Sequence, residues 1–371
     1  MKAKKVICID ARLWGGKHTG IGRYIENLID NLVKSSKYEF VLIVPPSLKS
    51  EPKLDSFTKY YARFHPYSLF SQFEMLYLLI IIRPDLVHIP HFTIPVLWPG
   101  KIVVTIHDLI KHFSKGSETT TRQKHTYWLK YFGYLLIVRL AVLRANHIIV
   151  PAYYWKKIIA QKFRLTTSKI SVTYEGVTEL YLQQKPNRDY DPPIAKPYIV
   201  YTGNLYPHKN LPTLFKAIKL LNGKVNLAIV CVRSVFTERA EKYIQREKVS
   251  RYVKFLGYVP DKELISLYSQ SEALVQPSLI EGFGLTGLEA MAVKTPVIAA
   301  NASCLPEVYQ NAALFFEPLD SNDLYKKILL LLENNKKRIN LVKKGQKLIK
   351  KFSWRKMAKQ TVNIYLKTIQ E

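Results

Sequence analysis

Residues 277–291 read PSLIEGFGLTGLEAM, and no other stretch of the chain says as much about the fold. The stretch follows an apolar run at 273–275, passes through a glycine-rich loop and enters a helical pattern at about Leu285. A strand, a glycine-rich turn and a helix in this order are typical of a parallel α/β sheet. The backbone amides of Gly284, Leu285 and Thr286 would open the helix, and such a helix start favours a phosphate group.

Two carboxylates frame this loop. Glu281 precedes the predicted helix, whereas Glu289 lies at least one turn inside it. The pair can therefore hold two parts of an elongated ligand, such as the hydroxyls of a hexose and those of a ribose. An isolated pair of glutamates is usually a solvated surface, but glycines and small residues flank this pair, which favours a binding role.

The alternation of short apolar runs and helical patterns extends in both directions from this stretch. The strand-like runs are 6–9, 40–44, 86–89, 101–106, 147–150 and 170–173, then 198–201, 225–230, 253–255, 273–275, 296–299 and 314–316. Between the two series, residues 186–197 are rich in proline and aspartate and predict a linker. We expect an α/β protein of two Rossmann-like, doubly wound parallel-sheet domains that face each other across a cleft.

The loop after the first strand is a second glycine-rich turn at a helix start. It contains Gly15, Gly16, Thr19, Gly20 and Gly22, and its amides could approach a phosphate or an acceptor. The loop is neither a P-loop nor the dinucleotide fingerprint, because both spacings are absent. The alternative is a turn without a ligand.

Two further residues stand at the ends of predicted strands. His107 follows the run 101–106 and is expected to point into the cleft, where it can bond a sugar hydroxyl; a core histidine is the alternative. In the second half, Gly203 follows a strand, and Lys209 precedes a helix that begins near Leu211. The lysine ammonium can therefore meet a diphosphate, with a solvated lysine as the alternative.

The formal net charge of +28 is the strongest compositional feature. Residues 119–174 contain no acidic residue, ten lysines and arginines, and several tyrosines and tryptophans. Basic residues mixed with aromatic ones favour peripheral contact with an anionic membrane over nucleic acid, which we do not expect as a partner. A solvated basic face is the alternative.

The cysteines and the apolar runs bear on location. Cys8, Cys231 and Cys304 are far apart and lack metal-ligand spacing, which is typical of buried thiols in a reducing compartment. The apolar runs 76–82 and 134–143 are too short to span a bilayer, and no leader peptide is recognisable. We expect a cytoplasmic protein, peripheral at the inner face of the cell membrane.

Taken together, the motifs resemble a family 4 glycosyltransferase of the GT-B fold. The resemblance rests on the Glu281–Glu289 pair within EGFGLxxLEAMA, on His107-Asp108, and on looser matches at 19–24, 174–177, 203–210 and 305–308, in the family's order. Trp354 fits the closing helix that crosses back onto the first domain. The resemblance implies an acceptor-binding domain of 1–185 with helix 354–371, a linker of 186–197, and a donor-binding domain of 198–353.

The resemblance also implies residue roles. His107 and Glu281 would be the catalytic residues that act on the sugar, and Glu289 would bind the ribose. Lys209 and the helix start at Leu285 and Thr286 would hold the diphosphate. The remaining donor contacts would come from Gly203, Gly282, Phe283 and Gly284, and the phosphate or acceptor loop from Gly15, Gly16, Thr19, Gly20 and Gly22.

The implied reaction moves a hexose, with mannose as the favoured sugar, from a nucleotide diphosphate sugar to a saccharide acceptor expected to be lipid-linked. Such transferases serve surface polysaccharide or glycolipid synthesis and retain the anomeric configuration. They need no metal and no cofactor, because cationic side chains and helix dipoles neutralise the leaving diphosphate.

Two departures from the family pattern leave alternatives open. His208 and Asn204 stand where basic residues are frequent, and residues 151–155 read PAYYW in place of a Ser-x-x-Ser-Lys pattern. Arg233 could supply the missing cation. The alternatives are a non-catalytic pseudo-enzyme or subunit of the same fold, and a nucleotide-sugar epimerase, against which the glutamate pair argues.

Overall fold

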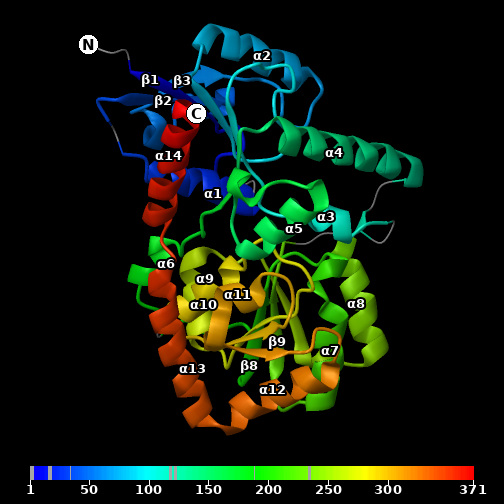
Figure 1. Ribbon diagram of the computed structural model, residues 1–371. Helices are drawn as coiled ribbons and strands as arrows, with labels where there is room; N and C mark the ends of the chain where they lie inside the picture. Colours follow the sequence, from blue (N-terminus) through cyan, green and yellow to red (C-terminus); the bar gives the residue numbers. More distant parts are fainter. Residues whose placement is uncertain are drawn as a thin grey trace. The chain divides into compact units, whose positions relative to one another are not determined.

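The computed structural model describes residues 4–15, 19–33, 35–116, 119–120, 123–187, 189–232 and 235–371. The chain forms two compact units, and Figure 1 shows them with many of their elements labelled. The first comprises Met1–Leu109, Gln123–Glu175 and Ser353–Glu371, and the second comprises Ile110–Arg122 and Gly176–Phe352. The chain thus leaves the first unit before residue 176, so the predicted boundary at 185 lies too late and the stretch 186–197 belongs to the second unit. The C-terminal helix belongs to the first unit.

The first unit is built on a seven-stranded sheet in the order β3-β2-β1-β4-β5-β6-β7. All of its strand pairs are parallel. The strands are β1 (Lys5–Asp10), β2 (Tyr38–Val44), β3 (Thr58–Tyr61), β4 (Leu86–Ile89), β5 (Ile102–Thr105), β6 (His147–Val150) and β7 (Ile170–Val172). The order reverses between β1 and β4, and parallel sheets bind ligands at the carboxyl ends of strands at such a point.

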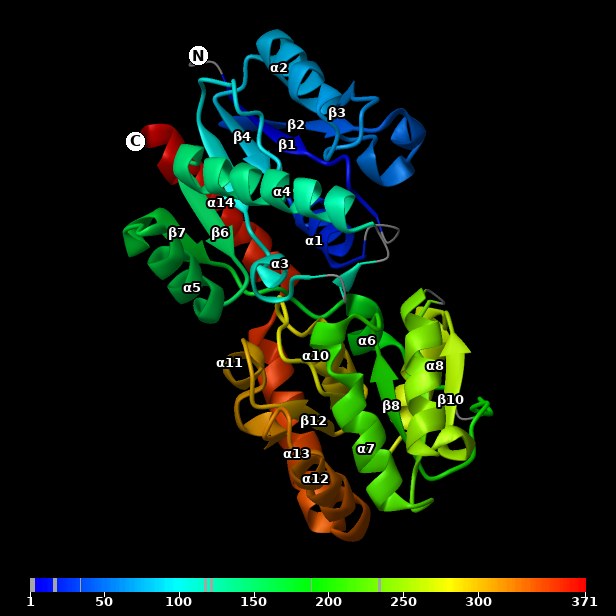
Figure 2. The ribbon, with the colours of Figure 1, turned by 90° about the vertical axis from the view of Figure 1, so that its right-hand side faces the viewer.

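The helices of the first unit cover both faces of this sheet. They are α1 (Thr19–Asp30), α2 (Phe70–Ile82), α4 (Lys124–Arg144), α5 (Tyr153–Phe163) and α14 (Trp354–Gln370). Helix α1 connects β1 to β2, and α2 connects β3 to β4 in the opposite direction across the sheet. Because such crossovers are right-handed, α2 and α4 lie on one face, and α1 and α14 pack together on the other (Figures 1 and 2).

The second unit has a six-stranded parallel sheet in the order β10-β9-β8-β11-β12-β13. Its strands are β8 (Tyr198–Thr202), β9 (Asn226–Val230), β10 (Val253–Gly257), β11 (Leu274–Gln276), β12 (Val297–Ala300) and β13 (Ala313–Phe316). Its helices are α3 (Ile110–Phe113), α6 (Glu179–Gln183), α7 (Leu211–Leu221), α8 (Val235–Glu247), α9 (Asp261–Ser269), α10 (Leu285–Ala292), α11 (Leu305–Tyr309), α12 (Ser321–Glu333) and α13 (Asn335–Leu348). Here the strand order reverses between β8 and β11.

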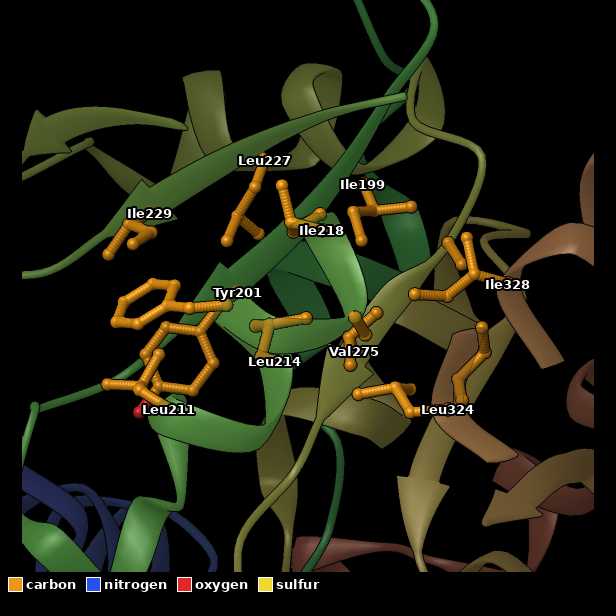
Figure 3. Close-up of a cluster of buried hydrophobic side chains, with 14 of the residues drawn as sticks. Ile199, Tyr201, Leu211, Leu214, Ile218, Leu227, Ile229, Val275, Leu324 and Ile328 are labelled. Carbon is orange, nitrogen blue, oxygen red and sulfur yellow. The ribbon is translucent and has the colours of Figure 1, made fainter. Parts of the chain in front are cut away.

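A buried cluster fixes the strands that carry the predicted motifs, as Figure 3 shows. Helix α7 places Leu214 and Ile218 four residues apart on one face, where they pack against the sheet. Val275 of β11 joins them, and the other side chains labelled in this cluster are Ile199, Tyr201, Leu211, Leu227, Ile229, Leu324 and Ile328. Since these side chains are almost fully buried, the carboxyl ends of β8 and β11 are held rigidly.

The predicted parallel α/β architecture is confirmed, and each strand-like run of the sequence overlaps a strand. Strand β3, which reads TKYY and forms an exposed edge of the first sheet, is not among the strands expected from the sequence. The apolar run 134–143 is itself too short to span a bilayer, but it belongs to a longer apolar segment of α4, His125–Arg144. Within the described residues, α4 is the one helix that passes a length and composition test for a membrane span, a test that core helices also pass.

Candidate functional site

The loops that follow β8 and β11 are fastened to each other at the carboxyl edge of the second sheet. Asn210, in the left-handed conformation just before α7, donates from its side-chain amide to the carbonyls of Pro277 (3.1 Å) and Pro318 (2.5 Å). The backbone amide of Leu279 donates to the carbonyl of His208 at 2.8 Å. Two motifs that are distant in the sequence therefore form one site.

Lys209 and Glu281 meet at this junction. The lysine Nζ lies 2.8 Å from each carboxylate oxygen, and the two side chains are only 13% and 12% exposed. Gln276 at the end of β11 donates its amide to Glu281 Oε1 at 2.9 Å. Burial alone would raise the pKa of Glu281, but the charge and hydrogen bond of Lys209 hold it below its ordinary value. The pair is thus a partly buried, charge-assisted contact.

A buried tyrosine supports the loop from behind. The hydroxyl of Tyr309 bonds the side-chain oxygen of Gln276 and lies 2.6 Å from the carbonyl oxygen of Gly284. Gly284 has φ 104°, and a Cβ there would stand 2.6 Å from the Tyr309 hydroxyl. Only glycine therefore fits at the start of α10. Gln276 and Tyr309 are not among the residues predicted from the sequence, because nothing local marks a tyrosine that acts across such a separation.

The backbone of Glu281 has its own anchor. The Ser303 hydroxyl accepts from the Glu281 amide at 3.3 Å and donates to its carbonyl at 3.2 Å. The Cys304 thiol also donates to that carbonyl, at 3.3 Å. Cys304 is therefore a packing thiol, and burial raises its pKa well above the ordinary value. Within the described chain the three cysteines are free and buried.

The remaining donor-side residues predicted from the sequence surround this pair. Helix α10 begins at Leu285 with Gly284 as its N-cap, a position without a side-chain cap. Thr286 lies in its first turn, where its hydroxyl reaches the Gln276 oxygen at 3.4 Å. Glu289 is buried further inside the helix. Gly203 directly follows β8 and has φ 147°. Gly282 and Phe283 complete the loop.

His208 and Asn204, the two residues of the 203–210 loop that depart from the family pattern, both make contacts within the loop. The His208 ring stacks on Tyr206 with centroids 5.9 Å apart. Burial first, and then the charge of Lys209, lower the pKa of His208 to about 4. His208 is therefore neutral at pH 7 and leaves Lys209 as the only cation that this loop supplies. Asn204 accepts the Tyr206 amide at 3.4 Å, and Arg233 lies outside the described residues.

In the first unit, His107 follows β5 and both of its ring nitrogens have acceptors. Nδ1 lies 3.3 Å from Glu175 Oε1, and Nε2 lies 3.1 Å from the Pro90 carbonyl. The Tyr24 ring meets the imidazole edge-on at 4.7 Å. The two contacts fix the orientation of the imidazole at this edge of the sheet.

A buried polar row runs behind His107. The hydroxyl of Tyr365 on α14 lies 2.5 Å from His88 Nδ1, His88 Nε2 lies 2.8 Å from the Thr105 hydroxyl, and that hydroxyl lies 3.2 Å from the hydroxyl of Tyr24. Burial is the main cause that lowers the pKa of His88 to about 3, so the ring is neutral. His88 and Tyr365 are not among the residues predicted from the sequence.

A second buried group closes the carboxyl end of β1. The Arg12 guanidinium holds both oxygens of Asp10, at 2.8 and 2.7 Å, and His91 Nε2 lies 3.0 Å from Asp10 Oδ2. Burial would raise the pKa of Asp10, yet the Arg12 charge holds it well below its usual range. Arg12 also donates to Ser71 at 2.7 Å, which joins the start of α2 to this edge.

The first glycine loop is described only in part. Gly15 has φ 94°, and Gly22 lies so close to the backbone of Gly15 and Leu13 that a Cβ would collide with it. Gly22 therefore serves the packing of the loop against α1, whose first two residues are Thr19 and Gly20. Gly16 lies outside the described residues. In the stretch 151–155, which departs from the family's Ser-x-x-Ser-Lys pattern, Trp155 is fully buried and packs in the core.

Among the described residues, no group of three or more His, Cys, Asp or Glu side chains could hold a metal ion. The predicted residues gather in two places. Lys209 and Glu281 lie with the start of α10 in the second unit, and His107 lies with Glu175 in the first.

Comparisons with known proteins place these features in a family. The profile described as "Glycosyl transferases group 1" matches residues 184–348, and "Glycosyltransferase Family 4" matches residues 18–179. The O-antigen chain mannosyltransferase RfbU of Salmonella typhimurium is 32% identical over 272 residues, which cover 72% of each protein. The O-antigen chain mannosyltransferase B of Escherichia coli is 33% identical over 172 residues, 45% of each.

Solved structures share the fold at low sequence identity. A sucrose-phosphate synthase from Thermosynechococcus elongatus superposes with a TM-score of 0.76 at 18% identity, covering 98% of this chain and 99% of the other. Anabaena HepE in complex with UDP-glucose gives a TM-score of 0.75 at 15% identity, covering 98% and 100%. These two matches extend over both units.

Proposed function

The chain belongs to the family 4 glycosyltransferases, and from this premise we propose that it moves a hexose from a nucleotide diphosphate sugar to a saccharide acceptor with retention of the anomeric configuration. The observation that carries the proposal is the Lys209–Glu281 pair beside the uncapped start of α10. A cation, a helix N-terminus and a carboxylate stand together there, and these are the groups that a diphosphate sugar needs.

We assign the donor to this junction in the following way. Lys209 and the amides at Leu285 and Thr286 face the diphosphate, which takes the place of Glu281 as the partner of the ammonium. The Glu281 carboxylate then accepts hydrogen bonds from sugar hydroxyls, and Glu289 holds the ribose. Gln276 keeps the carboxylate in position during the exchange, because its amide already donates to Glu281.

The proposed reaction needs no metal and no cofactor. Charge on the leaving diphosphate is met by Lys209 and by the dipole of α10, and preorganised groups of this kind stabilise a developing anion strongly. Because His208 is neutral at pH 7, Lys209 carries this task within the 203–210 loop.

Retention follows from attack on the face that the diphosphate leaves. The bond from the anomeric carbon to the phosphate oxygen breaks, and a bond to the acceptor oxygen forms on the same side. The acceptor proton passes to the leaving phosphate oxygen, so no enzyme nucleophile is used. In this scheme the role of Glu281, and likewise that of His107, is to bind sugar hydroxyls.

For the donor and the acceptor we propose mannose and a lipid-linked saccharide. The two mannosyltransferases of O-antigen chains described above support the sugar. The ten cations and the absence of acids in 119–174 support a location at the inner face of the cell membrane, where a lipid-linked acceptor would stand. Nucleic acid is not a proposed partner.

Donor and product analysis tests the proposal. GDP-mannose, UDP-glucose and UDP-N-acetylglucosamine are compared by thermal shift, and the anomeric configuration of the product is read by NMR, with and without a chelator. We expect GDP-mannose to stabilise most, the α-linkage of the donor to be kept, and the chelator to have no effect. An inverted product, or activity lost with the chelator, would contradict the mechanism.

One observation favours the non-catalytic alternative, namely the missing cation at His208 and Asn204. A pseudo-enzyme would bind the donor and yet neither transfer nor hydrolyse it at saturation. An epimerase would convert the donor without any acceptor. The same product analysis separates the three.

A further inference from the structure

Helix α2 exposes an apolar stripe that the packing of the first unit does not use. Its buried positions are Ser71, Met75, Leu78 and Leu79. Its outer stripe and the residue before it are between 47% and 84% exposed, and they are Leu69, Phe70, Phe73, Tyr77, Ile80 and Ile81. An ordinary surface helix is polar on its outer face, so a contiguous stripe of this size marks an interaction surface.

Helix α4 carries a similar stripe with cations beside it. Trp128, Leu129, Phe132, Leu136 and Leu143 recur at helical spacing and are between 41% and 75% exposed. The exposed cations of the same helix are Lys130, Arg139 and Arg144. Helix α2, by contrast, contains no lysine or arginine.

The two stripes form one surface. Both helices lie on the same face of the sheet (Figure 2), and a row of aromatic rings leads from the segment just before α2 to α4. Tyr67 stacks on Phe92 with centroids 5.5 Å apart, and Phe92 meets Tyr134 of α4 edge-on at 5.2 Å. Leu97 adds a further exposed apolar side chain in the loop between them.

We propose that α2 and α4 form a membrane-docking surface in which α2 enters the interface of an anionic bilayer and the cations of α4 hold the anionic headgroups. The charge pattern selects this occupant, because an anionic surface complements a region without acids from 119 to 174. A second copy of the chain would place like charges opposite each other, which opposes self-association through this surface.

The docking surface borders the His107–Glu175 pair of the first unit. Phe92 follows His91, and the carbonyl of Pro90 accepts the hydrogen bond from His107 Nε2 at 3.1 Å. Tyr67 also meets the His91 ring edge-on at 6.1 Å. A saccharide whose lipid is buried at α2 would therefore stand near His107. This last step rests on the proposed function, whereas docking itself does not.

Vesicle co-sedimentation separates the contribution of apolar burial at α2 from that of the positive charges on α4. Vesicles of phosphatidylcholine alone, or with one quarter phosphatidylglycerol, are mixed with the full chain at low and high salt. The variants are Phe73→Ser with Ile80→Ser on α2, and Lys130→Gln with Arg139→Gln on α4. The matched control is Tyr258→Ser with Leu319→Ser, which removes two exposed apolar side chains from the second unit.

We expect the native chain to prefer the anionic vesicles. The α2 variant should bind about tenfold more weakly at both salt concentrations, because it loses interfacial burial. The α4 variant should lose on the order of tenfold at low salt and little at high salt, because only its charge is removed. The control should bind as the native chain does.

Three results would overturn the proposal. The α2 variant could bind as tightly as the native chain, the native chain could ignore both vesicles, or light scattering could show a dimer that the α2 variant abolishes. Transfer to a water-soluble saccharide is measured in parallel. Since the variants lie outside the proposed donor site, transfer should persist in all of them, and its absence in the native chain would instead contradict the proposed function.

Discussion

The carboxyl edges of the two sheets are built in different ways. In the second unit, the charged pair Lys209 and Glu281 comes from two short loops, and each loop carries its own sequence motif. In the first unit, Asp10, His91 and His107 come from three different strand ends, and a residue of the last helix completes the buried row. We infer that the second edge is made for a ligand, whereas much of the first edge holds the unit together.

This comparison predicts which property each substitution changes. All five tryptophans lie in the first unit, at positions 14, 98, 128, 155 and 354. Tryptophan fluorescence therefore follows the unfolding of the first unit, and nucleotide binding reports on the second.

Asp10→Asn should give the largest loss of stability. It leaves the Arg12 guanidinium buried without its charged partner, which costs about 3–5 kcal/mol in the free energy of unfolding. Urea unfolding followed by tryptophan fluorescence at pH 7 measures this, and nucleotide affinity should stay unchanged. A loss below about 1 kcal/mol would show that the pair is not a structural anchor.

The pH dependence of the same variant sharpens the test. The folded pKa of Asp10 lies below its unfolded value of about 3.9, so the carboxylate contributes stability above that pH and loses it as pH falls further. The native chain should therefore lose stability steeply below about pH 4, and Asp10→Asn much less. The loss caused by His88, whose pKa is about 3 when folded and about 6.5 when unfolded, sets in at higher pH and should remain in both.

Glu281→Gln should act on turnover far more than on nucleotide affinity. Its carboxylate is proposed to serve the sugar as the glycosidic bond breaks, so kcat should fall by about 10²–10³, or roughly 2.7–4 kcal/mol. Binding of free nucleoside diphosphate, measured by calorimetry, should change by less than about threefold. Glu333→Gln, an exposed glutamate at the end of α12, is the matched control. Equal losses in affinity and turnover would point to a general defect.

Lys209→Ala should weaken nucleoside diphosphate binding by about 1.5–3 kcal/mol, and Glu289→Ala by a similar amount, since each loses a charged hydrogen bond. Lys209→Ala also leaves the buried Glu281 carboxylate unpaired, so the second unit should lose stability. Adding Glu281→Gln should restore that stability without restoring affinity. Lys216→Ala, an exposed lysine on α7, serves as the control. If the double variant regained affinity, the diphosphate assignment would fail.

More of the candidate site residues in the second unit than in the first could be predicted from the sequence, and the reason is physical. Gly284, Glu281 and Lys209 act through local backbone geometry at helix starts, and the chain must encode such geometry within a few residues. Tyr365 and His88 are 277 positions apart, and only the packing of α14 on the sheet brings them together. Likewise β3 could not be read from TKYY, because a short edge strand lacks the apolar signal of a buried one.

The smallest expected effect belongs to Tyr365→Phe, which removes one hydroxyl from the buried row. His88 Nδ1 loses its partner, and a neutral buried hydrogen bond contributes about 0.5–1.5 kcal/mol to stability. Because the pKa of His88 is about 3, the ring is neutral from pH 5 to 8, and the loss should be the same across that range. Fluorescence-monitored unfolding at both ends of the range measures it, with Tyr258→Phe as an exposed control.

The same variant decides whether the row is structural or also supports the chemistry. Hydrogen bonds lead from Tyr365 as far as the Tyr24 hydroxyl, whereas His107 is held by Glu175 and by the Pro90 carbonyl. We therefore expect kcat of Tyr365→Phe to stay within about twofold of the native value, since its ΔΔG should appear in unfolding and not in the barrier. A fall in kcat of about tenfold with unchanged nucleotide affinity would show that the Tyr24 ring, 4.7 Å from the imidazole, transmits the position of α14 to His107. In that case the carboxyl edge of the first sheet would also serve the reaction, as that of the second sheet is proposed to do.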